Sequence, residues 1–583
     1  MTLYGLYLFI QYFIITTFQT VIYNKAITQQ KRSSNTGVLF WFFWLLLFVL
    51  YYPAAKAGFV TDFTGWLDQV KNHPFWEYIN RTNFHAKSLY QFTQFNTYIF
   101  YKLFGINAWL WHLLFIMLHA INTYLLFGLI SSLLEDAEVA NGRAISFSGA
   151  LLFCISPYMS EVIVWEPSFH FLQGLLLILL ILIFVQRFVH TQENKYAWRA
   201  LIVYFLSTFT LEIFYITPWL VLTVALFYRV NPLKDKKVFR KVLLQFFLPL
   251  LLLFSLRLLM YRLIYGDWVS RIGTGAITSI QMENFGKPAK YLFHLLFLGR
   301  FFPQSVKESI YAYCDSGKGI VIFYSLVASI CIFIVTRFHH MGGKGKVASL
   351  LFTWTFISLA LLIPLWFGDM LLVLFDRYTY FFAAFLYMLI TVLISFITLQ
   401  YVRLALISIY VLVNLRFTIQ VSRFWAKSSR VDQGLLNNFP SAGNKTVILL
   451  NLPESMKGVA MIGSDFESEY KFMHNLLLPG KEISNTVYDA MSYNMNTPDD
   501  GAHATVINDS TVRVTLNQWG TWWFFAGKGG FSYQNNDYRL NLTDPGRVYE
   551  LTLKKPAPQY LLLYAVGNQW KIVDWNKKNV DQD

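Results

Sequence analysis

The feature that most constrains this chain is a series of apolar segments that continues to about residue 422. Each segment is close to the roughly 20 residues that a helix needs to cross a lipid bilayer. The segments are 4–24, 38–55, 107–134, 144–160, 168–187, 198–215, 216–229, 242–263, 318–336, 348–367, 378–399 and 403–422. They predict an α-helical, polytopic membrane domain over residues 1–422, with twelve spans, give or take one.

The breaks between these segments differ in charge, and the difference predicts the side of the membrane on which each lies. Lys and Arg gather in the breaks 25–32, 187–199, 229–241 and 337–346. Because cytoplasmic loops collect Lys and Arg, the other breaks should face the opposite side. Those breaks carry isolated acids at the ends of spans, namely Asp62, Glu161, Glu166, Asp369 and Asp376. We therefore expect a multi-pass protein of the plasma (bacterial inner) membrane whose chemistry takes place on the extracytoplasmic face.

Composition argues against several classes of protein. The net charge is +15, but from Arg423 onward the 16 Lys and Arg residues balance the 16 Asp and Glu residues. The positive excess therefore lies in the membrane half, where it orients the protein in the bilayer. It does not predict a nucleic-acid partner. The three cysteines lie in two apolar spans and a loop and indicate neither a disulfide framework nor a metal site. No glycine-rich stretch follows a strand and opens a helix, so no nucleotide cradle is expected. A substrate donor should therefore come from the membrane.

Two of the outer segments, 56–106 and 264–317, are long. Each contains an aromatic, amphipathic stretch, at 89–104 and 291–302, that predicts a helix lying on the membrane surface. A transporter usually keeps its outer loops short, whereas an enzyme needs a platform for its substrate. The two segments therefore favour an enzyme.

From residue 441 the pattern changes to short β-type runs bounded by Gly, Asn, Asp and Pro. The runs are 445–450, 503–507, 511–516, 521–525, 548–553, 560–565 and 571–575. One helix is expected at 465–478, because Ser464 and Glu467 have the spacing of a capping box. With 423–440 as a linker, residues 441–583 predict a small, β-rich extracytoplasmic domain.

The first candidate site residue is Asp62, about seven residues beyond the second span, in Gly58-Phe-Val-Thr-Asp62. A carboxylate at the dry, aromatic rim of a membrane is desolvated, which raises its basicity. This property suits a general base that takes a proton from a hydroxyl group. The alternative is a solvated loop aspartate. Asp68 is a second acid of the same outer segment and a candidate for binding substrate.

A second acidic turn, between two spans, reads Ser156-Pro-Tyr-Met-Ser-Glu161-Val-Ile-Val-Trp-Glu166-Pro-Ser-Phe-His170. Glu161, Glu166 and His170 should face the same boundary as Asp62, which makes them candidates for binding substrate. Two Glu and a His also permit a metal ion, but their spacing across a Pro-containing turn is not specific. No metal or other cofactor is therefore supported, and structural hydrogen bonding is the alternative role.

The stretch Asp376-Arg377-Tyr378 opens the eleventh predicted span from the outer side. An Arg at headgroup level can bind a phosphate with its planar fork, so Arg377 and Tyr378 are candidates for binding a lipid phosphate. The alternative is a local ion pair between Asp376 and Arg377. His112 and His119 are seven residues apart and share one helix face, where we expect packing residues rather than ligands.

Four blocks of sequence stand out together: Gly58-Phe-Val-Thr-Asp62, then Leu103-Phe-Gly-Ile-Asn107 with Trp111, His112, His119 and Asn122, then 153–165 with Pro157 and Glu161, and finally Asp376-Arg377-Tyr378-Thr-Tyr380. They resemble the type C (GT-C) glycosyltransferases, specifically the branch that holds protein O-mannosyltransferase-like and related bacterial membrane enzymes. Two departures from that family are that Phe63 follows Asp62, where the family often has a second acid, and that Leu211 replaces a lysine next to Glu212.

The resemblance implies a GT-C-like fold and an inverting transfer of a sugar from a polyprenyl-phosphate donor to a hydroxyl of a glycan, lipid or protein acceptor. It assigns Asp62 as the general base and Arg377 with Tyr378 to the departing phosphate. Glu161 and His170 would shape the sugar pocket or hold Asp62. Asp62, Glu161 and Arg377 should then meet in one pocket at the outer rim. Two rival functions are a transporter or flippase for a lipid-linked glycan, and a non-catalytic anchor that presents the β domain.

Overall fold

The structure, a computed structural model, describes most of the chain from residue 34 to residue 576. Asp62, Asp369 and the first predicted span, 4–24, lie outside the described residues. Inside these bounds, the residues left undescribed are 61–62, 87–88, 211, 231–235, 267, 269–281, 365–375, 463–468, 517–521, 524–532 and 545–547.

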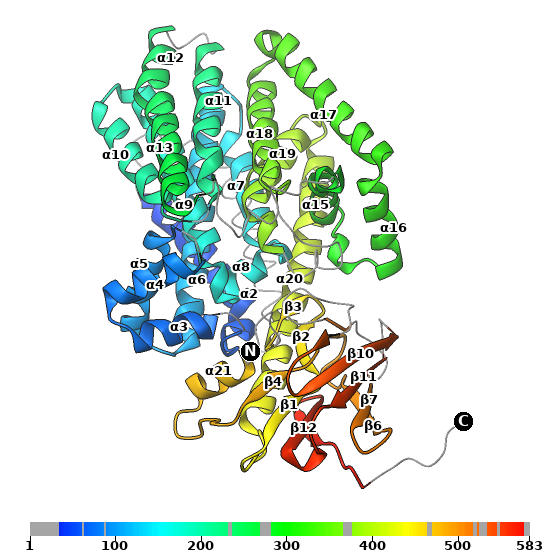
Figure 1. Cartoon of the computed structure of the whole chain (residues 1–583). Helices are drawn as coiled ribbons and strands as arrows, with labels where there is room; N and C mark the ends of the chain where they lie inside the picture. The colour runs from blue at the N-terminus through cyan, green and yellow to red at the C-terminus, as the bar shows by residue number, and fades with distance from the viewer. Residues whose placement is uncertain are drawn as a thin grey trace.

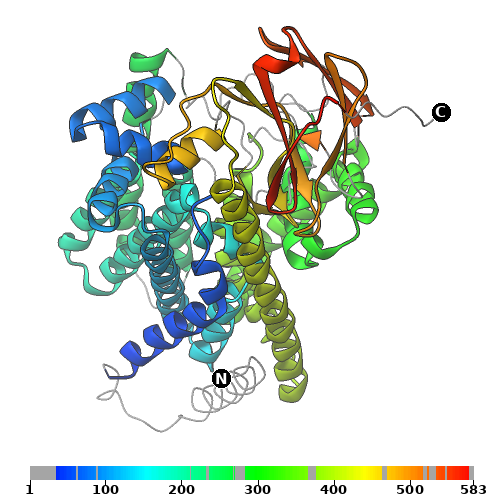
Figure 2. The same ribbon diagram turned by 90° about the horizontal axis from the view of Figure 1, so that it is seen from below.

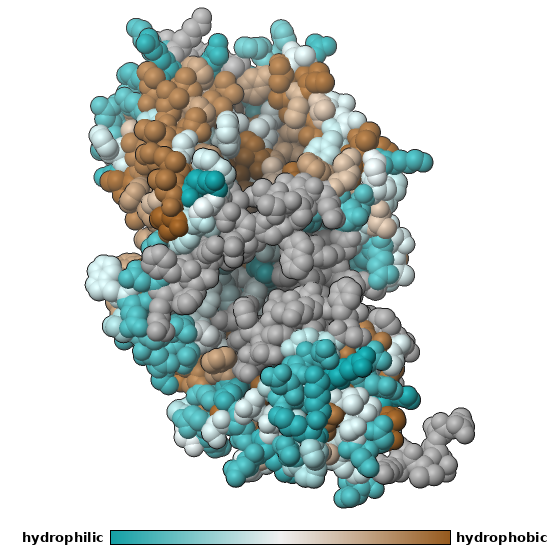
Figure 3. All heavy atoms as spheres, viewed as in Figure 1, coloured by the Kyte–Doolittle hydropathy of each residue, from teal (hydrophilic) through white to brown (hydrophobic). Residues whose placement is uncertain are grey.

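Eight helices among the described residues are long and apolar enough to cross a membrane, or nine if one bent pair counts as a span. Figure 3 shows the matching surface, with hydrophobic side chains over the upper helices and hydrophilic ones over the lower domain. The chain is a multi-pass membrane protein. The spans are built from α2 (Ser34–Ala55), α6 (Ala108–Asp136), η3 (Glu166–Ser168) with α9 (Phe169–Thr191), η4 (Glu212–Ile216) with α11 (Thr217–Val230), α12 (Lys236–Val242) with η5 (Leu243–Phe247) and α13 (Leu248–Tyr265), α17 (Gly317–Arg337), η10 (Asp376–Thr379) with α19 (Tyr380–Ile394), and α20 (Gln400–Asn437).

The count is lower than the predicted twelve for identifiable reasons. The expected span 198–215 is the 14-residue helix α10 (Asn194–Ser207), which at 1.5 Å per residue is too short for a bilayer. The expected span 348–367 is α18 (Gly343–Ala360), whose first turn carries Lys344 and Lys346 and is therefore less apolar. The expected span 144–160 is α7 (Gly142–Cys154), after which the chain bends by 53° into η2 (Pro157–Met159) and α8 (Ser160–Val164).

The centre of the bundle is formed by α6, α7, α9 and α19, whose side chains are mostly buried. Helices α7 and α19 cross closely at Gly149, where a Cβ atom would lie only 2.5 Å from Met388 Sδ. Small residues permit such crossings between membrane helices. At the periphery, α17 presents bare apolar residues such as Val335 and Ile332 to its surroundings, as expected for a helix that faces lipid.

The domain after residue 440 is made mostly of β-sheets, as predicted. One sheet has the order β13-β12-β1-β4, the second is the antiparallel sheet β6-β7-β11-β10-β9, and the third has the order β3-β2-β5-β8. The strands are β1 (Thr446–Leu449), β2 (Leu452–Met456), β3 (Val459–Ala460), β4 (Val487–Asp489), β5 (Ser492–Met495), β6 (Ala502–Val506), β7 (Thr511–Leu516), β8 (Trp522–Trp523), β9 (Tyr533–Gln534), β10 (Tyr538–Asp544), β11 (Val548–Leu553), β12 (Tyr560–Val566) and β13 (Gln569–Ile572).

The β domain packs against one end of the helical bundle, which we call the β-domain end (Figure 1). The predicted linker 423–440 is helical through Asn437, so α20 runs without a break from the bundle to the sheets, as Figure 2 also shows. The domain's helix α21 (Glu469–Leu477) contacts α3 (Phe63–Asn72) of the first outer segment. A single cluster of buried apolar residues extends from the bundle into the β domain.

The two outer segments are helical, as expected. The first contains α3, α4 (Phe75–Ala86) and α5 (Gln91–Phe104), and the second contains α15 (Lys287–Leu296), η7 (Gly299–Phe301) and α16 (Gln304–Asp315). In Figure 1, α3–α5 lie beside the junction between the bundle and the β domain, and α15 and α16 flank the bundle on the other side. The segments thus frame the end at which the acidic turns meet.

Candidate functional site

Glu161 and Arg377 meet at the β-domain end of the bundle, although they are 216 positions apart in the sequence. Pro157 interrupts the α7 helix, and α8 then carries Glu161 across the bundle. The Glu161 carboxylate accepts a 2.8 Å hydrogen bond from the backbone N–H of Arg377 and forms an ion pair with the Arg377 guanidinium. Two of the three residues expected to share a pocket are therefore in direct contact.

The Arg377 guanidinium is held on several sides. Its central carbon lies 4.3 Å from the ring centre of Trp165 and 4.9 Å from that of Tyr378, so both rings make cation–π contacts. The Tyr378 ring in turn contacts Phe171, the neighbour of His170. His170 is within electrostatic range of Arg377. The structure thus gathers Glu161, His170, Arg377 and Tyr378, while their roles in binding substrate stay predictions.

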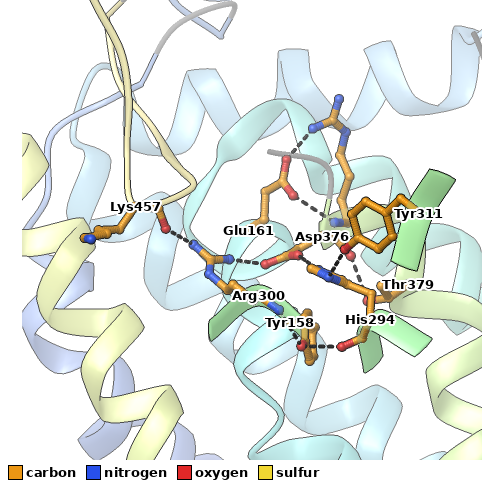
Figure 4. Close-up of polar contacts among 9 residues, drawn as sticks. Tyr158, Glu161, His294, Arg300, Tyr311, Asp376, Thr379 and Lys457 are labelled. Carbon is orange, nitrogen blue, oxygen red and sulfur yellow. Dashed lines mark hydrogen bonds and ion pairs between the residues drawn. The ribbon is translucent and has the colours of Figure 1, made fainter. Parts of the chain in front are cut away.

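Asp376 does not pair with its neighbour Arg377, contrary to the alternative of a local ion pair. Its fully buried carboxylate accepts from two residues of the second outer segment instead. His294 Nε2 lies 2.9 Å from Asp376 Oδ1, and the Arg300 guanidinium forms an ion pair with Oδ2 (Figure 4). Two consecutive residues of η10 therefore bind different parts of the protein. Arg377 binds Glu161 of α8, and Asp376 binds His294 of α15 and Arg300 of η7.

The surroundings of His294 favour its neutral form. The residue is completely buried, and this burial lowers the pKa of His294, although the nearby Asp376 carboxylate opposes the shift. A neutral imidazole that donates from Nε2 to Asp376 must accept at Nδ1, where the Tyr311 hydroxyl lies at 3.1 Å. Tyr158 completes the shell by donating to the backbone carbonyl of His294 at 2.5 Å.

The β domain also reaches this cluster. The turn between β2 and β3 places Lys457 and Gly458 in left-handed conformations, at φ values of 51° and 77°. The backbone carbonyl of Lys457 accepts a 2.9 Å hydrogen bond from the Arg300 guanidinium (Figure 4). Arg300 therefore connects Asp376 of the bundle with the β domain.

Glu166 lies apart from this cluster. Its fully buried carboxylate has Oε1 2.9 Å from His112 Nε2, and His112 Nδ1 lies 3.0 Å from the carbonyl oxygen of Ala55, at the end of α2. His119 is likewise surrounded by packing partners, with Nδ1 at 2.9 Å from the Tyr380 hydroxyl. Glu161 and Glu166 thus face different partners, and no cluster of three potential metal ligands is found among the described residues.

The first outer segment is described only on either side of Asp62, which lies outside the described residues. Phe63, the next residue, is buried and its ring centre lies 4.9 Å from that of Trp111. Asp68 is on α3 and accepts a hydrogen bond from Asn72 at 2.9 Å in an exposed setting. The roles of Asp62 as a base and Asp68 as a substrate ligand therefore stay predictions.

The sequence interpretation placed His294 and Arg300 on a surface helix and assigned them no function. A signal for them was present, because Lys287, Lys290 and His294 recur at helical spacing. Basic residues are uncommon on the outer side of a membrane protein, so several of them at a regular helical spacing indicate a buried partner. That partner, Asp376, lies 82 positions away from His294, a distance that no local pattern reveals.

Comparisons with known proteins give only a distant likeness. No family model and no curated protein matches the sequence. Two crystal structures of the Archaeoglobus fulgidus oligosaccharyltransferase are similar to this chain, one in complex with Zn and sulfate and one tethered to an acceptor peptide with the NVT sequon. Their TM-scores are 0.34 and 0.40, each at 12% identity, and the matches cover 78% and 79% of this chain. The chain spans 62% and 64% of the length of those chains, less than two thirds.

Proposed function

We propose that this protein is a membrane glycosyltransferase that moves a sugar from a polyprenyl-phosphate donor to a hydroxyl acceptor on the extracytoplasmic face. The observation that carries the proposal is the buried cluster of charges at the β-domain end. Ionisable residues inside membrane proteins are costly, and by default they mark functional sites. Here Glu161 of α8, Asp376 and Arg377 of η10, and Arg300 of η7 converge from three separate segments.

The chemistry follows from the proposed donor. The Asp62 carboxylate takes the proton of the acceptor hydroxyl, whose oxygen attacks the anomeric carbon from the face opposite the phosphate. The bond between that carbon and the phosphate oxygen breaks, and the phosphate leaves with the electron pair. One base is sufficient because the phosphate is a good leaving group. Arg377, with Tyr378 beside it, stabilises the charge that develops on the phosphate.

The position of Arg377 supports this role. Its guanidinium is preorganised by Glu161 and the two aromatic rings, yet the side chain stays 12% exposed. A preorganised cation stabilises developing charge without the cost of moving during the reaction. In this proposal Glu161 and His170 hold the sugar and orient Arg377.

The test is a transfer assay with the full-length protein in nanodiscs. Radiolabelled polyprenyl-phosphate sugars are supplied with candidate acceptors, and product is separated from donor by chromatography. Wild type should form product, and Asp62→Asn should lower kcat by at least about 100-fold, as expected for loss of a general base. Binding of the donor should remain within about twofold of wild type, because the amide preserves the shape of the side chain.

The matched control is Glu77→Gln, which removes an acid from the same outer segment; the Glu77 side chain is 45% exposed and contacts His73. This variant should retain the activity of wild type. If Asp62→Asn is as active as wild type, Asp62 is not the base. If wild type moves intact donor across the membrane without forming product, the protein is a flippase and the proposal is wrong.

A further inference from the structure

Lys307 of α16 is a mostly buried lysine with no counter-ion among the described residues. Only 7% of the residue is exposed, and its side chain has no hydrogen bond or ion pair among the residues that the structure describes. A buried charge of this kind is expensive unless a partner compensates it. Burial lowers the pKa of Lys307, and the adjacent Arg300 lowers it further. The folded protein therefore holds Lys307 in a place that disfavours its charged form.

A second donor beside Lys307 also lacks a partner. The Nε–H of Arg300 is buried and has no hydrogen-bond acceptor in the part of the chain that the structure describes, although the other two nitrogens of the guanidinium bind Asp376 and the carbonyl of Lys457. Unsatisfied buried donors are rare in folded proteins, and each one needs an explanation. A water molecule could accept from Arg300, but it would leave the charge of Lys307 uncompensated.

Among the described residues, the charges around these two donors add to a positive excess. Lys307, Arg300 and Lys457 are within electrostatic range of one another, and Asp376 is the one buried carboxylate that the structure places in the same range. Its two oxygens are already divided between His294 and Arg300. Two other acids do not neutralise the excess. Glu308 is exposed to solvent, and the oxygens of Asp500 accept from residues of its own turn.

We propose that Lys307 and Arg300, together with the turn of Lys457, form a binding site for a phosphate group at the junction of the bundle and the β domain. A phosphate offers the negative charge and the several acceptor oxygens that these donors lack, and lysine is well suited to it as a point charge. The site differs from the Glu161–Arg377 pair, because its donors come from α16, η7 and the turn of Lys457 rather than from α8 and η10. The identity of the phosphate as that of a lipid-linked donor rests on the proposed function, whereas the binding itself does not.

The experiment measures binding of phosphate compounds without any sugar or acceptor. Phosphate binding can therefore fail while sugar transfer succeeds, and sugar transfer can fail while phosphate binding succeeds. Full-length protein in phosphatidylcholine nanodiscs is titrated with farnesyl phosphate or with inorganic phosphate, each against chloride at the same ionic strength. Binding is read from the shift in the midpoint of thermal unfolding and from calorimetry. Tighter binding of farnesyl phosphate would identify a membrane lipid as the source, and equal binding would identify a free phosphate. Either result supports the site.

The decisive variant is Lys307→Met, with Lys318→Met as the control, because Lys318 is an exposed lysine in the first turn of α17, the helix that follows α16. Lys307→Met should weaken phosphate binding at least about tenfold, as expected for loss of a charge-assisted hydrogen bond. It should also leave the melting temperature of the phosphate-free protein unchanged or higher, because a buried, unpaired charge has been removed. A purely structural lysine would give the opposite result.

Three results would overturn the proposal. The first is that wild type binds neither phosphate. The second is that Lys307→Met binds phosphate as tightly as Lys318→Met does. The third is that Lys307→Met lowers the melting temperature of the phosphate-free protein, which would make Lys307 a structural residue.

Discussion

The two halves of the molecule use ion pairs in opposite ways. At the β-domain end of the bundle, the pair Glu161–Arg377 is 5% and 12% exposed. In the β domain, the cross-strand pair Arg513–Glu550 is 50% and 26% exposed, although its shortest distance is an ordinary 2.8 Å. The same kinds of side chain are thus desolvated in one half and hydrated in the other.

This difference indicates that the helical bundle, unlike the β domain, bears the cost of removing charged groups from water. Exposed pairs contribute about 0–1 kcal/mol each, because water competes for both charges. Buried pairs lose so much hydration that apolar replacements of similar size are often as stable or more stable. The bundle nevertheless keeps four charged groups at one end, linked to the β domain through the carbonyl of Lys457. Stability alone does not explain them, whereas the charged donor of the proposed function would.

The largest loss of stability is expected when the cation of the buried Glu161–Arg377 pair is removed and the carboxylate is kept. Arg377→Met leaves Glu161 desolvated without its cation, which should cost about 3–5 kcal/mol. The cost is read as a lower midpoint in denaturant titrations of the detergent-solubilised protein. The double variant Glu161→Gln with Arg377→Met should recover most of this loss, because no charge is left unpaired. If single and double variants are equally unstable, the pair does not behave as a buried ion pair.

The sequence predicted the long spans and the regular strands well, because their patterns are local. The segment 318–336 became α17 and the run 511–516 became β7. Other elements depend on tertiary contacts. Strand β2 contains Pro453 and Glu454, which argue against a strand until β3 and β5 pair with it on either side. The bend after Cys154 likewise turns a predicted span into two short helices.

The site was predictable only in part, for a physical reason. That Glu161 and Arg377 face the same boundary follows from the alternation of charge between spans, and their contact is observed. Which residues neutralise Asp376 is decided by how α15 packs on the bundle, and sequence spacing carries no information on that. The left-handed turn at Lys457 lies in another domain altogether.

The second largest effect concerns pH and His294. Because burial lowers the pKa of His294 in the folded state, the unfolded chain takes up a proton first as the pH falls below about 6.5. Stability should then fall by up to about 1.4 kcal/mol per pH unit. The Gln side chain in His294→Gln can still donate from its Nε2 to Asp376. This variant should therefore lose the part of the pH dependence of the unfolding free energy that His294 contributes, over the roughly two units between about pH 7 and about pH 5.

The control for the pH experiment is His339→Gln, which changes an exposed histidine at the end of α17. Unfolding midpoints of both variants and of wild type are compared across the same pH series. A slope for His294→Gln that matches those of His339→Gln and wild type would show that His294 is not held neutral by burial.

A smaller effect is expected in the turn that joins the two halves. Gly458→Ala places a Cβ in the left-handed region, which costs about 1 kcal/mol. Gly480→Ala should cost a similar amount, since Gly480 has a φ of 87° in open space. Only Gly458→Ala should also weaken phosphate binding, because it displaces the carbonyl that orients Arg300. Equal binding by both variants would mean that the turn does not position Arg300.

The smallest effect is expected for the exposed pair of the β domain. Arg513→Met should change the free energy of unfolding by no more than about 0.5 kcal/mol, because Arg513 and Glu550 are both hydrated and the pair is screened by salt. Raising the salt concentration should reduce even this difference. Arg377→Met should stay costly at high salt, since screening does not reach a buried pair. Salt dependence therefore separates the two classes of ion pair more sharply than stability alone, and a loss at Arg377 that high salt abolishes would place both pairs in the same class.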